Sequence, residues 1–166
     1  MDRNRKGHRP GRDRPAPACD SNDRRGRAAG NTGSRGGAGG RIPVRRYRNQ
    51  RRGRLYLACL AYHEARGEPF EGQVAVIEVV LNRCLSDYFP DTVEEVVFQK
   101  YGDVWQFSPA PYLYTAEPTE TQYEAVYAAL AAEEPILPLD TVYFSTGPYN
   151  DSIVAVIGNH YFCSIF

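Results

Sequence analysis

The sequence lacks a hydrophobic run of about 20 residues, the length needed to cross a membrane as a helix. It also lacks the apolar stretch of about 7 to 15 residues, followed by small residues, that is typical of a secretory signal peptide. Its four cysteines, at positions 19, 59, 84 and 163, include no pair with CxxC spacing. The sequence therefore predicts no membrane span and no cysteine-based metal knuckle or redox motif.

The first 53 residues contain few aromatic or β-branched residues and consist mainly of Arg, Gly, Pro, Asn and Asp. Such a segment buries too little apolar surface to offset the conformational entropy lost on folding. We therefore expect a disordered Arg/Gly-rich tail over residues 1–53 and a folded domain over residues 54–166.

The formal net charge of zero conceals a division of charge along the chain. Residues 1–54 carry 17 of the 20 Lys and Arg and four acidic residues, a net charge of +13, whereas residues 55–166 carry three basic and 16 acidic residues, a net charge of −13. The basic part is open to three interpretations: a solvated tail, an extension foreign to the natural product, or an arm that binds anionic polymers. Because it lacks interleaved aromatic residues that stack on bases, we expect no specific nucleic acid partner.

Helical patterns dominate the start of the acidic segment. A run of helix-forming residues from Leu55 ends at Gly67, which suits a helix C-cap and puts Glu64 in the last turn. A second helix is expected from about Pro69 through Arg83, with apolar residues at helical spacing. Additional valines widen its apolar face, so we expect this helix to be largely buried.

Two capping boxes predict two further helices. Thr92 is followed three residues later by Glu95, and Thr119 is followed by Gln122 at the same spacing. Between these helices, residues 99–118 are predicted to be a loop rich in Gly, Pro and aromatic residues. Long loops in compact domains are more often functional than idle.

Short β patterns follow the helices. Residues 141–144 and 160–163 have strand-like composition, and turn signals at Gly147-Pro148 and Gly158-Asn159 separate them. Helices followed by a small sheet predict an α+β fold.

Several motifs in this region occur together in one known family. They are Tyr62-His-Glu-Ala-Arg-Gly-Glu-Pro-Phe-Glu-Gly-Gln-Val-Ala-Val76, Val80-Leu-Asn-Arg83, Phe89-Pro90, Val96-Val97-Phe98, Gln106-Phe-Ser-Pro109 and Ile157-Gly-Asn-His-Tyr-Phe-Cys163. In content, order and approximate spacing, residues 55–166 closely resemble the SleB-type cell wall hydrolases.

The resemblance implies a lysozyme-like fold, mainly helical with a small antiparallel sheet near the C-terminus. It implies cleavage of peptidoglycan glycan strands between N-acetylmuramic acid and N-acetylglucosamine, in spore cortex or cell wall, by a muramidase or lytic transglycosylase. Glu64 takes the position of the family's catalytic glutamate, and no metal or organic cofactor is expected. We expect a monomer that acts on peptidoglycan outside the cytoplasm, although no signal peptide is visible.

The chemistry also points to Glu64 without the family name. Glycosidic cleavage needs a protonated carboxyl group beside the leaving oxygen, and a glutamate in an aromatic, partly desolvated site has a raised pKa. Glu68, four residues later, is a candidate for the same site, but it equally suits a helix N-terminal charge. The resemblance favours a reaction that uses a single glutamate.

Further substrate-binding candidates come from the aromatic loop and the strands. Gln106, Phe107 and Ser108 offer a flat apolar face bordered by hydrogen-bonding groups, which suits a sugar ring. The alternative for Phe107 is that it fills the core. Tyr143 and Asn159 are weaker candidates of the same kind.

Histidine gives two open alternatives. His160 is either a substrate contact or a packed residue at the end of a strand. His63-Glu64 lacks the second histidine of the zinc protease motif, since position 67 is Gly. A zinc site built from His63, His160 and Cys163 is chemically acceptable but is not expected. The rival function from another class is a peptidoglycan-binding module without catalytic activity.

Overall fold

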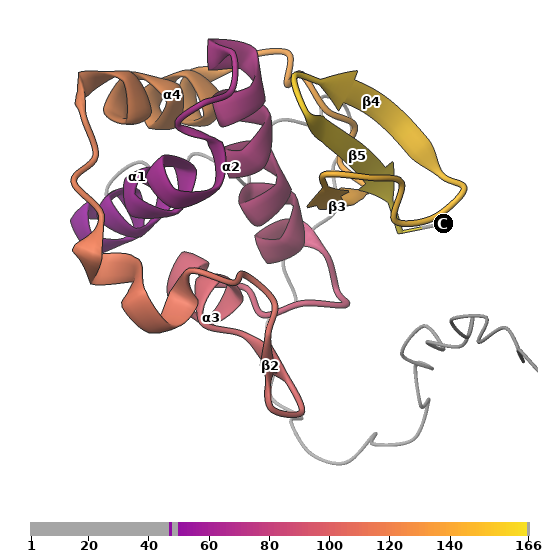
Figure 1. The fold of residues 1–166 in the computed structure, drawn as a ribbon, viewed down its shortest axis with the longest axis horizontal. Helices are drawn as coiled ribbons and strands as arrows, with labels where there is room; N and C mark the ends of the chain where they lie inside the picture. The colour runs from indigo at the N-terminus through magenta and orange to yellow at the C-terminus, as the bar shows by residue number, and fades with distance from the viewer. Residues whose placement is uncertain (1–46, 48–49, 166) are drawn as a thin grey trace, which may run out of the picture. The chain divides into compact units, whose positions relative to one another are not determined.

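The computed structural model describes Tyr47 and residues 50–165 (Figure 1). Most of the tail expected over residues 1–53 lies outside these described residues. The described part begins earlier than expected, because helix α1 (Arg51–Ala65) starts four residues before Leu55. Tyr47 is only 2% exposed, and its hydroxyl donates a hydrogen bond to the carbonyl oxygen of Asp91 at 2.7 Å. A single aromatic residue in a polar stretch has no periodicity, so the sequence pattern did not reveal this anchor.

Helix α2 (Phe70–Leu85) lies between the other helices and the sheet (Figure 1). It packs against α1 and against α4 (Glu120–Ala131) on one side, and against the first strand of the sheet on the other. Residues 72–84 of this helix are all buried. The prediction of a largely buried second helix is confirmed.

The predicted capping box at Thr119 is complete, and at Thr92 the N-cap half of the box is present. The Thr92 hydroxyl accepts a hydrogen bond from the backbone N–H of Glu95 at 3.2 Å and opens the short helix α3 (Val93–Val97). At the start of α4, the backbone N–H of Thr119 donates to the side chain of Gln122 at 2.8 Å. These contacts satisfy N–H groups that would otherwise lack partners at a helix start.

Residues 99–118, predicted as a loop, contain short regular elements. Strands β1 (Lys100–Tyr101) and β2 (Val104–Trp105) form an antiparallel hairpin, and Gly102 in its turn has a φ of 58°. A 3₁₀ element, η2 (Ala110–Thr115), follows. Strands of two residues are too short to show the alternation on which sequence-based prediction depends.

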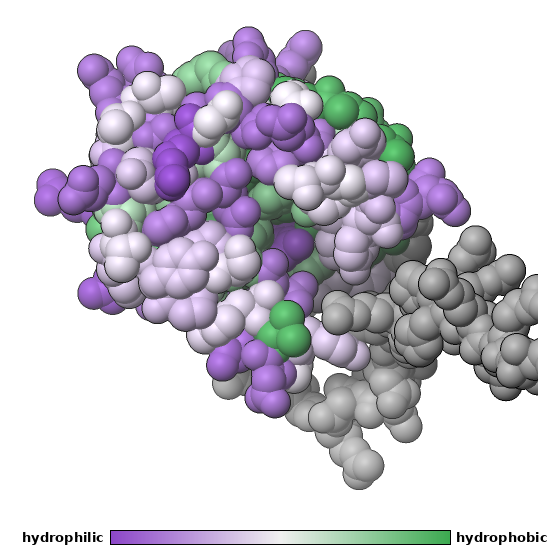
Figure 2. Space-filling model, viewed as in Figure 1, coloured by the Kyte–Doolittle hydropathy of each residue, from purple (hydrophilic) through white to green (hydrophobic). Residues whose placement is uncertain are grey.

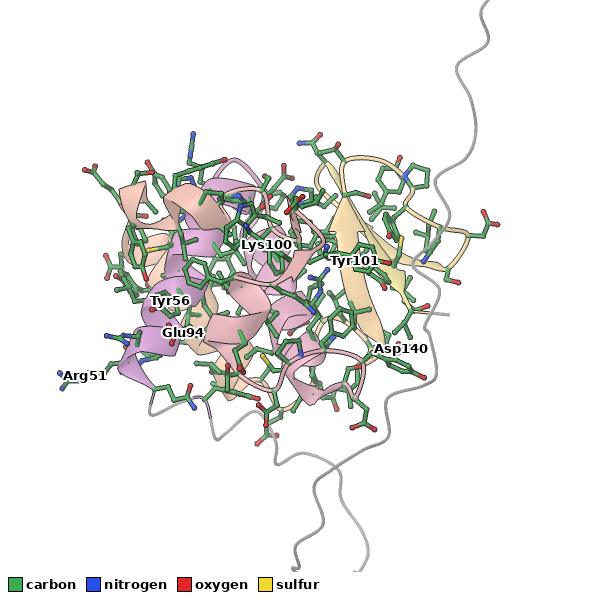
Figure 3. All side chains as sticks on the ribbon, turned by 90° about the horizontal axis from the view of Figure 1, so that it is seen from below. Arg51, Tyr56, Glu94, Lys100, Tyr101 and Asp140 are labelled. Atoms are coloured by element: carbon green, nitrogen blue, oxygen red, sulfur yellow. The ribbon has the colours of Figure 1, made fainter. Side chains whose placement is uncertain are left out.

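A tyrosine pair joins this segment to the helices. The Tyr56 hydroxyl on α1 donates to the Glu94 carboxylate of α3 at 3.4 Å and accepts a hydrogen bond from the Tyr114 hydroxyl of η2 at 3.2 Å (Figure 3). The hydrogen bond with Tyr114, followed by burial and the negative charge of Glu94, raises the pKa of Tyr56 to about 12. The Tyr56 hydroxyl therefore stays protonated and can donate its hydrogen bond to Glu94 throughout the physiological pH range.

The C-terminal sheet is antiparallel and has the strand order β3-β5-β4. Its strands are β3 (Thr141–Ser145), β4 (Ile153–Ile157) and β5 (His160–Ser164). Sequence analysis found β3 and β5 but missed β4, whose five residues are all apolar and show no alternation. The α+β prediction, mainly helical with a small antiparallel sheet near the C-terminus, is confirmed.

Buried polar side chains on α2 fasten the sheet to the helices. The Asn82 side-chain amide donates to the carbonyl oxygens of Pro138 and Thr141, both at 2.9 Å. The Arg83 Nε donates to the carbonyl oxygen of Val142 at 2.7 Å. Asn82 and Arg83 are each 4% exposed, so these bonds form away from competing water.

Other polar side chains of α2 bind two further segments. The Glu78 carboxylate accepts hydrogen bonds from the backbone N–H groups of Ile136 and Leu137 at 3.0 and 2.9 Å. The Gln122 side chain of α4 donates to the Gln73 side chain of α2 at 2.8 Å. Helix α2 thus specifies the position of α4 and of the chain leading into β3.

Helices α1, α2 and α4 have 15, 16 and 12 residues. Among the residues that the structure describes, no helix combines the length and the apolar character needed to cross a membrane.

Replacing Asn82 with Ala should destabilise the fold. The change removes the side-chain donor to the carbonyl oxygens of Pro138 and Thr141, of which that of Pro138 keeps a bond from the Thr141 backbone N–H. Loss of the donor to the buried Thr141 carbonyl costs about 1 to 3 kcal/mol of the free energy of unfolding. Urea unfolding followed by circular dichroism measures the loss. Glu124→Ala, at an exposed position of α4, is the control, and an equal loss in both variants would contradict this account of the α2 face.

Candidate active site

Glu64 lies in the last turn of α1, as predicted, and is partly buried. The preceding residue, His63, has its ring 5.2 Å from that of Tyr112 in η2, and the following residue, Ala65, packs in the cluster that contains Phe162 of the sheet. Successive residues on an α-helix differ by about 100° in direction. The Glu64 side chain therefore points between η2 and the sheet.

The surface is hollowed on the face between the helices and the sheet (Figure 2). Helix α2 lies behind this part of the surface (Figure 1). Two aromatic residues of η2 are exposed: Tyr112, which is 49% exposed and contacts the ring of His63, and Tyr114, which is 68% exposed. Sugar-binding sites commonly combine such aromatic faces with polar groups.

The Glu64 carboxylate has no hydrogen-bond or ion-pair partner among the described residues. Burial therefore acts on it without compensation and raises its pKa. A raised pKa keeps a larger fraction of the carboxyl protonated near neutral pH. This is the property required of a general acid.

Glu68 has the opposite environment. Its carboxylate accepts hydrogen bonds from the Asn159 backbone N–H at 2.8 Å and from the Asn159 side-chain amide at 3.0 Å. These bonds lower the pKa of Glu68. The structure thus brings together two predicted substrate-binding residues, Glu68 and Asn159, but they bind each other.

The Glu68 contact holds the turn between β4 and β5 against the loop after α1. Gly158 in this turn has a φ of 59°, a conformation that favours glycine. A Cβ atom at this position would overlap the Glu68 carboxylate. Both the turn conformation and the close approach of Glu68 therefore require Gly158.

His160 is 5% exposed and packs between aromatic rings. Its ring centroid lies 5.2 Å from that of Phe144 and 6.1 Å from that of Phe162. Burial lowers its pKa, and the nearby Glu68 charge opposes this shift in part. Of the two alternatives from the sequence, this geometry supports the packed residue at the end of a strand.

Phe107 is 2% exposed and belongs to the hydrophobic core. Its expected role as a direct substrate contact is therefore corrected to that of an anchor, because a side chain in the core has no surface to offer a sugar. The adjacent Gln106 and Ser108 are exposed. The anchor fixes the segment and leaves these two polar residues at the surface.

Sequence analysis missed the structural role of Arg83 in this region. Its guanidinium lies 4.7 Å from the ring centroid of Phe107, 5.1 Å from that of Phe89 and 5.7 Å from that of Tyr143. Burial lowers the pKa of Arg83 to about 10, so it stays charged at neutral pH. An arginine on a predicted helix is usually taken as solvated, and the neighbouring aromatic residues come from distant parts of the chain.

Tyr143, the remaining candidate, is partly buried on β3. Its ring stacks on that of Tyr149 with centroids 4.8 Å apart. Through the shared contact with Arg83, the structure places Tyr143 near the Gln106–Ser108 segment.

The zinc alternative, built on His63, His160 and Cys163, was also open from the sequence. Among the described residues, no group of three or more His, Cys, Asp or Glu side chains is arranged to hold a metal ion. Cys59, Cys84 and Cys163 are buried, and no disulfide joins any two of them.

A family model described as Cell Wall Hydrolase matches residues 67–163, more than half of the chain. The chain belongs to this cell wall hydrolase family. The matched region starts three residues after Glu64 and contains all the other candidate residues.

Curated relatives of this cell wall hydrolase are spore cortex-lytic enzymes. That of Bacillus subtilis (strain 168) is 36% identical over 114 residues, which cover 64% of this chain and 36% of the relative. That of Oceanobacillus iheyensis is 41% identical over 86 residues, covering 48% of this chain and 28% of the relative. The chain thus spans about a third of the length of the curated relatives it matches.

Solved structures show the same fold. The catalytic domain of the germination-specific lytic transglycosylase SleB from Bacillus anthracis superposes with a TM-score of 0.57 at 31% identity, covering 69% of this chain and 96% of that domain. The catalytic domain of the Bacillus cereus SleB protein gives a TM-score of 0.57 at 31% identity, covering 76% of this chain and all of that domain. The predicted SleB-type fold is confirmed.

The opposite pKa shifts of Glu64 and Glu68 predict opposite effects on stability. The folded-state pKa of Glu64 lies above the unfolded-state value of about 4.3. As pH rises from the unfolded-state pKa to the folded-state pKa, the fold therefore loses stability, because ionisation of Glu64 is less favourable in the folded protein. Glu64→Gln should therefore be more stable than the wild type at about pH 7, with the gain vanishing below about pH 4.

Glu68→Gln should behave in the opposite way. The lowered pKa of Glu68 contributes stability above the unfolded value of about 4.3, and this contribution is lost as pH falls through the folded value. The variant should be less stable than the wild type near neutral pH and should match it in acid. Urea unfolding of both variants across this pH range measures the two differences, and equal signs at neutral pH would refute the assignment.

Gly158→Ala should detach Glu68 from the turn. The positive φ costs about 1 to 2 kcal/mol for a residue with a Cβ atom, and the new methyl group displaces the Glu68 carboxylate. The free energy of unfolding should fall and the pKa of Glu68, followed by NMR, should rise toward its ordinary value. Gly147→Ala is the control, since a Cβ atom there meets no heavy atom within 4 Å.

Proposed function

We propose that this chain cleaves the glycan strands of peptidoglycan, with Glu64 acting first as general acid and then as base. The observation that carries the proposal is the environment of Glu64, a partly buried carboxyl group with a raised pKa and no partner among the described residues. Membership of the cell wall hydrolase family supports the substrate class.

The reaction begins with proton transfer from Glu64 to the oxygen that links N-acetylmuramic acid to N-acetylglucosamine. The bond between the anomeric carbon and this oxygen then breaks, which leaves a free hydroxyl group on N-acetylglucosamine and positive charge on the muramic ring. Protonation is required because an alkoxide is a poor leaving group.

Two reactions with different products are possible from this point, and they differ in the second step. In a hydrolase with two carboxylates, the second one activates a water molecule or attacks the sugar itself. Glu68, the second candidate, binds Asn159 and has a lowered pKa, so its carboxylate is committed to the β4–β5 turn. This arrangement favours a reaction with one glutamate.

With a single glutamate, the nucleophile is the 6-hydroxyl group of the same muramic residue. Its oxygen bonds to the anomeric carbon while its proton passes to the Glu64 carboxylate, which restores the acid. The product ends in 1,6-anhydromuramic acid, and no water is consumed. The similar solved domain from Bacillus anthracis is described as a lytic transglycosylase, which supports this route.

Gln106, Ser108 and Tyr143 are the proposed contacts to the glycan. The two loop residues are exposed beside the buried anchor Phe107, and Tyr143 is partly buried nearby on β3. Amide and hydroxyl groups at the edge of an aromatic surface suit the polar rim and apolar face of a sugar. Spore cortex is the proposed form of the substrate, because the curated relatives are spore cortex-lytic enzymes, and its location implies action outside the cytoplasm.

Glu64→Gln should abolish turnover of purified peptidoglycan while the protein stays folded and still binds glycan. Gln keeps the size of the side chain but has no proton to donate, and the loss should reach or exceed the upper end of the range of about 10² to 10⁴-fold for general acid catalysis. Mass spectrometry of released muropeptides measures the rate. Glu68→Gln, the matched control, should lose less activity because it removes a contact to Asn159 and not the acid.

The same digestion in isotopically labelled water tests the route. Wild-type products should end in 1,6-anhydromuramic acid without label. Label at the reducing end, together with equal losses in Glu64→Gln and Glu68→Gln, would indicate a hydrolase that uses two carboxylates. Binding without any cleavage by the wild type would indicate a peptidoglycan-binding module.

A further inference from the structure

A cavity of about 370 Å³ lies between α1 and α4, apart from the candidate active site. It is lined by Arg51, Arg54, Leu55, Tyr123, Val126 and Tyr127. Glu64 follows Arg54 by ten residues on α1, a distance of about 15 Å along the helix axis. The cavity is therefore at the opposite end of the helix that carries the proposed acid.

The charge around this cavity is unusual for the domain. Residues 55–166 hold only Arg66, Arg83 and Lys100 as basic residues, and Arg83 is buried. By contrast, the first turn of α1 carries three arginines, at positions 51, 52 and 54, and no acidic residue. Arg51 lies at the start of this helix, at the margin of the domain (Figure 3).

This concentration of positive charge is unfavourable for the helix itself. A helix N-terminus carries a partial positive charge, so cations in the first turn are destabilising and anions are stabilising. The N-cap residue, Gln50, makes no side-chain hydrogen bond to the first turn. An anion bound at this end of α1 would be stabilised by the helix dipole.

The side of the cavity formed by α4 is aromatic and accessible. Tyr127 is 56% exposed and Tyr123 is 36% exposed. The guanidinium of Arg54 lies 5.8 Å from the ring centroid of Tyr127. Guanidinium groups bind carboxylates and phosphates, and accessible tyrosine rings offer flat faces to sugars.

We propose that this cavity binds an acidic saccharide chain, with a carboxylate or phosphate group on Arg51 and Arg54 and a sugar ring against Tyr123 and Tyr127. The proposal rests on the proposed function for the identity of the polymer as a bacterial wall component. In that setting the oxyanion comes from one of two sources: the carboxylates of peptide-bearing glycan or the phosphates of a phosphodiester polymer. The site would hold the polymer at a second point, away from the bond that is cut.

NMR titration of the full chain carrying Glu64→Gln tests the site without cleavage. Three probes separate the sources: a soluble muropeptide with free carboxylates, a glycosylated glycerol phosphate oligomer, and a neutral N-acetylglucosamine oligomer. One of the two anionic probes should shift the amide signals of the first turn of α1 and of residues 123–127. The neutral oligomer should shift these signals only at much higher concentration, and added salt should weaken the anionic interaction.

Matched variants assign the effect to the cavity. Arg51→Gln and Arg54→Gln should each weaken binding at these signals by about 10-fold or more, the size expected for loss of a charge-assisted hydrogen bond. Arg52→Gln removes the same charge from the same turn, but Arg52 does not line the cavity, so its effect should be small. Arg54→Lys keeps the positive charge but lacks the planar guanidinium group. Weaker binding by this variant, with the fold unchanged, would therefore report the loss of bidentate contact and not a loss of folding.

The proposal fails if Arg52→Gln weakens binding as much as Arg51→Gln, because general charge attraction would then explain the affinity. It also fails if neither anionic probe shifts these signals, whether or not a short DNA oligonucleotide does so. Cleavage of peptidoglycan by the wild-type chain is measured separately. Loss of this site with cleavage intact would leave the proposed function in place.

Discussion

The fold depends on hydrogen bonds from buried polar side chains of α2 to the chain that packs around it. Asn82 and Arg83 bind backbone carbonyl groups at and before β3, and Glu78 binds the backbone N–H groups just upstream. A buried polar group without a partner costs free energy, so these hydrogen bonds favour this placement of the sheet against α2. The same helix packs against α1, which carries Glu64. The position of the proposed acid relative to the sheet is therefore set by α2, which itself contributes no candidate catalytic group.

Burial of Glu64 serves chemistry at a cost to stability. A fold with a partly buried carboxylate that has no partner would be more stable with a neutral amide at that position, and the raised pKa of Glu64 has the same cause. Glu68, four residues away, shows the usual structural solution, in which two hydrogen bonds from Asn159 stabilise the charge and lower the pKa. Environments that shift the pKa values of two carboxyl groups in opposite directions suit the two groups to different roles. Here the destabilised carboxyl suits proton transfer, and the stabilised one holds a turn.

Sequence analysis recovered the features that depend on local pattern or on a motif. The helix N-caps at Thr92 and Thr119 and the position of Glu64 in the last turn of its helix follow from neighbouring residues alone. The features it missed depend on distant contacts. Phe107 is a core anchor because Arg83 and Phe144 reach it from α2 and β3, and no spacing within residues 99–118 contains that information. The roles of Gln106 and Ser108 at the site stay predictions, since exposure alone does not show what they bind.

The acidic character of the domain constrains how it engages its proposed substrate. Peptide-bearing glycan is anionic, and residues 55–166 carry a net charge of −13, so long-range electrostatics oppose the encounter. Salt weakens this repulsion beyond a Debye length of about 8 to 10 Å, and affinity must come from shorter-range contacts. Neutral sugar faces can stack on exposed tyrosines such as Tyr112 and Tyr114 without meeting the carboxylates. Charged parts of the polymer instead require local positive potential, which the described domain concentrates in the first turn of α1. A neutral stacking surface near Glu64 and a basic site at the far end of the same helix bind different parts of the polymer. This separation allows a segment of net negative charge to bind an anionic substrate.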